Sequence, residues 1–115
     1  MALAEIETKR IEKTINALME RRRPPKSIRS KVDLGYRISG QSVELLEIRP
    51  RWDKPEVILK NAFAKATYVR TKRVWKVYWM RGNLKWQKYN PVPEVSSIEE
   101  FLAVVDQDEY SCFFG

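Results

Sequence analysis

The chain has 115 residues, of which 43% are hydrophobic and 32% are charged, which is the size and composition of one globular domain and excludes a disordered tail. The formal net charge is +7, and the chain has no histidine, which excludes histidine-based catalysis. Its single cysteine, Cys112, excludes an internal disulfide and favours a reducing, cytoplasmic compartment. No apolar run approaches the roughly 20 residues that a membrane helix needs, so we expect no membrane partner.

Residues 1–23 are predicted to form a helix. Their apolar side chains recur at the spacing of a single helical stripe: Ile11, Ile15, Leu18 and Met19. Pro24 and Pro25 end the helix, because proline lacks the N–H donor and clashes with the preceding turn.

A run of basic residues closes this helix and continues into a basic linker over residues 24–31. Four arginines in and around this run are candidate nucleic-acid contacts: Arg21, Arg22, Arg23 and Arg29. The alternative is a positively charged helix end, which complements the helix dipole, followed by a solvated loop. Both interpretations remain open from the sequence.

Residues 32–90 are predicted to form an antiparallel sheet of about five strands. Apolar and polar residues alternate over 32–39, which is the pattern of a half-buried strand. A two-residue loop at 40–41 would place Ile38 opposite Val43 and start a first hairpin.

The stretch from residue 57 to residue 93 holds nine Lys/Arg and no acid. It is predicted to form three strands, over about residues 61–70, 73–81 and 84–90, and the second turn is taken as a two-residue Gly-Asn loop. In that register Ala64 lies opposite Trp79, and Trp79 lies opposite Trp86, so the tryptophans share a face with small residues and are expected to be core residues. A slip of one residue would invert the two faces.

The same register places basic and aromatic side chains together on the opposite face of the sheet. This candidate nucleic-acid site consists of Lys65, Lys76, Tyr78, Lys85 and Tyr89. Ammonium groups neutralise phosphates while aromatic rings stack on bases, at about 1–3 kcal/mol per base. A solvated sheet face also favours lysine and tyrosine for strand propensity and solubility, so a face with no ligand is the alternative.

Trp52 lies in an irregular segment between Pro50 and Pro55. We hypothesise that it is a lid or a partner-binding anchor, since exposed tryptophans often dominate interfaces. The alternative is packing over the sheet edge.

Residues 96–106 are predicted to form a short helix, because Ser96 or Ser97 is followed three residues later by a glutamate, as in a capping box. The aromatic end of the chain is expected to dock as a terminal strand or plug. Residues 94–115 carry six acids and no base, so this segment is a candidate to neutralise the basic stretch.

One carboxylate arrangement is a distant candidate for catalysis. Asp33 precedes Glu47, and Arg49 follows two residues later, which resembles nucleases that place an acid before a Glu-x-Lys. The guanidinium of Arg49 stays protonated and is a poor base. We expect no cofactor and no metal site, and a metal-dependent nuclease-like enzyme is the weakest alternative.

A set of short motifs spans much of the chain: Glu47-Ile48-Arg49-Pro50-Arg51-Trp52, Ala64-Lys65, Trp75-Lys76-Val77-Tyr78-Trp79, Trp86-Gln87-Lys88-Tyr89 and Phe113-Phe114-Gly115. Together they resemble a small bacterial family described only as domain of unknown function 3024, over about residues 23–115. The resemblance implies a bacterial single-domain protein with no assigned activity, and it carries over no functional residues.

The sequence therefore predicts an α+β domain over residues 1–115, in which an antiparallel sheet packs its tryptophan-rich face against one or both helices. The leading expectation for function is non-catalytic binding of a polyanion, above all nucleic acid. The alternative is a protein-interaction or self-association module built on Trp52 and the terminal aromatics, with an acidic protein as another partner for the basic face.

Overall fold

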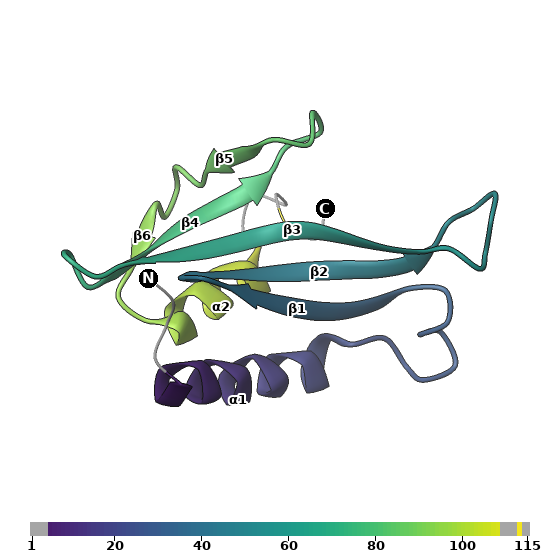
Figure 1. The fold of residues 1–115 in the computed structure, drawn as a ribbon, viewed down its shortest axis with the longest axis horizontal. Helices are drawn as coiled ribbons and strands as arrows, with labels where there is room; N and C mark the ends of the chain where they lie inside the picture. The colour runs from purple at the N-terminus through teal and green to yellow at the C-terminus, as the bar shows by residue number, and fades with distance from the viewer. Residues whose placement is uncertain (1–4, 109–112, 114–115) are drawn as a thin grey trace.

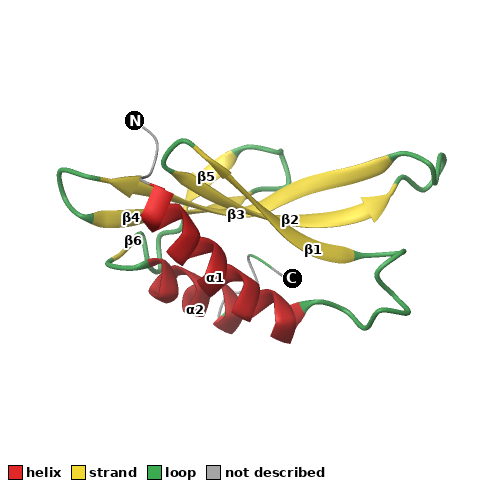
Figure 2. Cartoon of the chain, turned by 60° about the horizontal axis from the view of Figure 1, so that its bottom comes forward, coloured by secondary structure: helices red, strands yellow, loops and turns green. Residues whose placement is uncertain are grey.

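The computed structural model describes residues 5–108 and residue 113. Within these residues two helices lie on one face of a six-stranded antiparallel sheet (Figures 1 and 2). The first five strands are neighbours in chain order, and a short sixth strand pairs with the fourth. This arrangement confirms the predicted α+β class.

The N-terminal helix α1 runs from Glu5 to Arg22. Its predicted apolar stripe is buried against the sheet: Ile11, Ile15, Leu18 and Met19. The helix predicted over 1–23 is thus confirmed over residues 5–22. Residues 1–4 lie outside the part of the chain that the structure describes. None of the helices in residues 5–108 is long and apolar enough to cross a membrane.

The C-terminal helix α2 runs from Ile98 to Gln107 and begins at a capping box. The Ser97 hydroxyl accepts a hydrogen bond from the Glu100 N–H at 3.2 Å. The Glu100 carboxylate in turn accepts bonds from the Ser96 N–H at 3.1 Å and hydroxyl at 2.7 Å. These bonds satisfy donors that a helix start leaves open, as the serine-glutamate spacing predicted.

The sheet consists of β1 (Asp33–Ser39), β2 (Ser42–Pro50), β3 (Ile58–Val69), β4 (Val74–Met80), β5 (Trp86–Lys88) and β6 (Glu94–Val95). The predicted register of the first hairpin is confirmed, with Ile38 opposite Val43. The predicted pairing of β3 with β4 is also confirmed, with Ala64 opposite Trp79. The sixth strand was not predicted.

The predicted pairing of β4 with β5 is wrong by one residue. Trp79 lies opposite Gln87, and Met80 lies opposite Trp86. The reason is the turn, because Leu84 adopts a left-handed backbone (φ 61°) that closes a three-residue loop instead of the expected two-residue loop. The Arg81 N–H donates to the Lys85 carbonyl at 3.1 Å and fixes this longer connection. The faces of β5 are therefore exchanged.

The core lies between the two helices and one face of the sheet. Val77 and Phe101 are fully buried there, and Ala66 leaves room for the large side chains around it. Phe113 is buried as well, with its ring centroid 4.9 Å from that of Tyr89. The expected plug is confirmed at Phe113, and the remaining terminal residues fall outside the described part of the chain.

Candidate nucleic-acid interface

The face of the sheet turned away from α1 and α2 is called the open face here. Side chains alternate along a strand, so the burial of Ala66, Trp75 and Val77 against the helices directs Lys76 and Tyr78 to the other side. Figure 2 shows both helices on the opposite side of the sheet. The predicted face of lysine and tyrosine is therefore not covered by either helix.

A basic-aromatic cluster lies on the open face, where β3, β4 and β5 run side by side. The Lys65 Nζ lies 4.9 Å from the centroid of the Tyr78 ring and 4.7 Å from that of the Trp86 ring. Lys65 faces Tyr78 directly in the ladder, while Trp86 reaches the cluster from β5. All three side chains are half-buried. An ammonium at this range is attracted to both rings by cation–π interaction.

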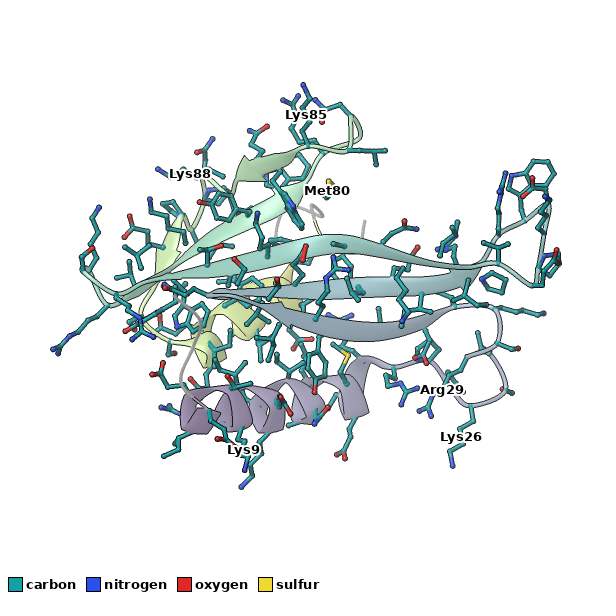
Figure 3. All side chains as sticks on the ribbon, viewed as in Figure 1. Lys9, Lys26, Arg29, Met80, Lys85 and Lys88 are labelled. Carbon is teal, nitrogen blue, oxygen red and sulfur yellow. The ribbon has the colours of Figure 1, made fainter. Side chains whose placement is uncertain are left out.

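Two further lysines flank this cluster. Lys88 lies opposite Tyr78 on β5 and is exposed, while Lys76 is half-buried on β4. Figure 3 shows Lys88 and Met80 on the β4–β5 side of the sheet, away from α1. We call the set Lys65, Lys76, Tyr78, Trp86 and Lys88 the basic-aromatic cluster from here on.

Acids approach the cluster from two sides. Glu44 lies opposite Lys65, and Glu94 lies opposite Lys76. The Glu44 carboxylate is bound by the Arg37 guanidinium, with Nη2 3.0 Å from Oε2. Its charge is therefore largely compensated within β1 and β2, and the cluster keeps a positive balance.

The family model described as "Domain of unknown function (DUF3024)" matches residues 3–115. The chain belongs to the DUF3024 family. The match starts within the first residues of the chain, so the family pattern includes the N-terminal helix and not only the part from about residue 23 that the motifs indicated. No curated protein matches the chain. No solved structure matches it either.

Two predicted members of the site are misplaced in this DUF3024 domain. Tyr89 is 2% exposed and belongs to the core, because the shifted register turns it toward the helices. Lys85 lies in the loop before β5 and is exposed there, not on the sheet. Lys76 lies opposite Glu94 of β6, and the Tyr89 N–H donates to the Val77 carbonyl at 2.9 Å.

Trp86 is the residue that sequence reasoning missed, since it was assigned to the core. The left-handed position in a three-residue hairpin loop is normally glycine or asparagine. Here it is Leu84, so the usual signal for this loop was missing. The Gly82-Asn83 pair pointed to the shorter loop instead.

The four arginines predicted as nucleic-acid contacts are engaged within the DUF3024 domain. Arg21 and Arg22 both pair with Asp106 of α2, at 3.5 Å and 2.5 Å, and Arg22 also donates to the Asp106 carbonyl. Arg23 forms two hydrogen bonds to Asp33, at 2.8 Å and 2.6 Å. Arg29 donates to the Pro24 carbonyl at 3.0 Å. These contacts connect the helix end to its surroundings.

The acids of the C-terminal helix turn toward α1 and not toward the open face. Glu99 pairs with Arg10 at 3.3 Å, and Asp106 pairs with the arginines at the end of α1. The Glu99 pKa is lowered, first by a hydrogen bond from a backbone N–H and also by Arg10. Glu94 of β6 is the described acid of this segment that lies beside the basic-aromatic cluster, opposite Lys76.

Trp52 lies at the turn between β2 and β3, and its side chain is 93% exposed. It does not pack over the sheet edge, which removes the alternative derived from the sequence. Its neighbours Arg51 and Asp53 form an ion pair at 2.7 Å.

The acids considered for a nuclease site do not converge. Asp33 lies opposite Ile48, the neighbour of Glu47, so the alternation of side chains directs the two carboxylates to different faces. Asp33 is bound by Arg23, and Glu47 pairs with Arg49 at 2.5 Å. No group of three acidic, histidine or cysteine side chains in residues 5–108 could hold a metal ion.

Proposed function

We propose that this DUF3024 protein binds single-stranded nucleic acid on the open face of its sheet. The observation that carries the proposal is the basic-aromatic cluster, in which the Lys65 ammonium lies against the rings of Tyr78 and Trp86. Such a cluster offers positive charge and aromatic surface within one small area. Nucleic acid presents the complementary pair of groups, a phosphate and a flat base.

Each part of the cluster has a distinct role in this proposal. Lys65, Lys76 and Lys88 neutralise phosphates and release counterions from the strand. Tyr78 and Trp86 provide faces on which successive bases stack, at about 1–3 kcal/mol per base. The cation–π contact of Lys65 keeps its ammonium beside the rings, so phosphate and base are bound by adjoining groups.

The aromatic members favour a single strand over a duplex. Bases in a duplex are stacked on one another, and their flat faces are unavailable to protein rings. An acidic protein or a sulfated polysaccharide would use the lysines and would gain little from Trp86. Dependence of binding on Trp86 therefore distinguishes nucleic acid from other polyanions.

The test is binding of a labelled single-stranded oligonucleotide, measured by fluorescence anisotropy at low salt. We expect the affinity to fall linearly on a log–log plot as salt rises, with a slope of about −0.7 for each phosphate neutralised. A duplex of the same length should bind more weakly. Absence of binding at low salt would overturn the proposal. Binding that needs the lysines but is unchanged when Trp86 is replaced would also overturn it, and would favour an acidic protein or a polysaccharide as the ligand.

A further inference from the structure

Strand β3 is longer than β4, so β4 pairs with only part of one edge of β3. It runs from Ile58 to Val69 and pairs with β2 over 58–67, but with β4 only over 64–69. Among the described residues, no strand pairs with the other edge of β3 over 58–62 (Figure 1). An edge of this kind presents unpaired N–H and C=O groups and can receive another strand.

Exposed apolar side chains surround this edge. Ile58 is 53% exposed and Leu59 is 37% exposed, while Val57 and Trp52 extend the apolar surface into the turn between β2 and β3. Proteins usually protect such edges with charged side chains or proline. Residues 57–62 contain one charged side chain, Lys60, and no proline, so this protection is slight. The combination indicates a surface for strand pairing.

We propose that a second copy of this chain pairs with this edge, antiparallel, about a two-fold axis at Leu59. Leu59 would then face Leu59 of the partner subunit. Lys60 would face Ile58 of the partner subunit, so the two lysines do not oppose each other. A register centred one residue later would instead place Lys60 against its own copy, which costs free energy.

Charge favours a second copy at this place. The chain carries +7, so two copies repel each other over most of their surface. Residues 47–62, in contrast, hold three acids and four bases, and four of these form ion pairs, Glu47 with Arg49 and Arg51 with Asp53. Two copies can approach through this segment because its net charge is only +1. The shared strand segment is short, so the dimer is expected to be weak and to depend on concentration.

The proposal predicts a specific disulfide. Facing residues of an antiparallel pair have Cα atoms about 4.5–5.5 Å apart, which is within reach of a disulfide. We expect Leu59→Cys, in a Cys112→Ser background, to form a covalent dimer on mild oxidation. The matched control is Leu84→Cys in the same background, because Leu84 is 81% exposed in the turn between β4 and β5. The control should link much more slowly at equal concentration.

Wild-type protein provides the second measurement and needs no variant to fold. Its mass in sedimentation equilibrium should rise from monomer toward dimer with concentration, and Ile58→Lys should suppress the rise by placing a lysine opposite Lys60 of the partner subunit. Constant monomer mass at every concentration, or equal cross-linking of the two cysteine variants, would overturn the proposal.

Discussion

The ammonium of Lys65 lies 4.7 Å from the centroid of the Trp86 ring, across the strand that separates them. This contact places Trp86 on the same face as the lysines. In the proposed function, Trp86 provides a ring on which one base stacks. We therefore expect Trp86→Ala to weaken oligonucleotide binding by about 1–3 kcal/mol, the value of one stacked base.

The matched control for this variant is Trp52→Ala. Trp52 is 93% exposed and lies in the turn between β2 and β3, beyond the end of β3 that extends past β4 and β5 (Figure 1). Its removal should leave the affinity unchanged in the same anisotropy titration. Equal losses in both variants would show that stacking is not confined to the basic-aromatic cluster.

The lysines of the cluster should act through charge. Lys76→Ala and Lys88→Ala are each expected to make the slope of log affinity against log salt shallower by about 0.7, because one phosphate fewer is neutralised. The measurement is a set of titrations at several salt concentrations. Lys26→Ala is the control, since Lys26 lies in the loop after α1, away from the cluster (Figure 3). An unchanged slope in both cluster variants would contradict the assigned role.

Tyr89 tests the corrected register. It is 2% exposed and packs on Phe113, so Tyr89→Ala should lower the free energy of unfolding by about 3–5 kcal/mol. Lys88→Ala, one residue earlier and exposed, should change it by less than about 0.5 kcal/mol. Denaturant unfolding followed by circular dichroism measures both. If Tyr89→Ala were as stable as wild type and bound the oligonucleotide poorly, Tyr89 would have to lie on the open face, and the corrected register would be wrong.

The contact between Arg23 and Asp33 predicts a pH dependence of stability. The hydrogen bond from Arg23 lowers the pKa of Asp33 below its usual value. The folded state therefore binds a proton at Asp33 less readily than the unfolded state does. This contribution is present above the unfolded pKa of about 3.9 and is lost as the pH falls through the folded value.

Asp33→Asn removes this contribution and should destabilise the protein by roughly 1 kcal/mol at neutral pH. The gap between wild type and variant should narrow as the pH falls below about 4. Urea unfolding at a series of pH values provides the measurement. A gap that stays constant down to acid pH would show that the Asp33 carboxylate is not stabilised in this way.

Local patterns in the sequence were sufficient to predict most of the fold. The stripe that includes Ile11 and Ile15 identified α1, and the serine-glutamate spacing at Ser97 identified the start of α2. The pairing of Ala64 with Trp79 followed from a small residue opposite a large one. In each case neighbouring residues, or residues across one short turn, carry the information.

The candidate site was predicted only in part, because it depends on a single loop. Lys65, Lys76 and Tyr78 were placed correctly, since they follow from the pairing of β3 with β4. Tyr89 and Trp86 exchanged faces, because the left-handed backbone of Leu84 lengthens the next turn by one residue. Leucine rarely adopts this conformation, so no local pattern indicated the longer loop.

Ion pairs between α1 and α2 could not be predicted from local sequence patterns either. The arginines at the end of α1 looked available for nucleic acid, yet Asp106 of α2 lies beside Arg21 and Arg22. The residues of these pairs are about 85 positions apart, so only the packing of α2 against α1 brings them together. Of the acidic segment, Glu94 lies opposite Lys76 of the basic stretch, whereas Glu99 and Asp106 pair with arginines of α1.

The proposed function requires the open face to bind a single strand through charge and stacking together. Its most direct test is the affinity of a labelled single-stranded oligonucleotide for the triple variant Lys65→Ala, Lys76→Ala and Lys88→Ala, compared with wild type and with Lys9→Ala plus Lys26→Ala. We predict that binding at low salt is lost in the triple variant and kept in the control, with both proteins folded. Equal binding by the triple variant and wild type would contradict the account.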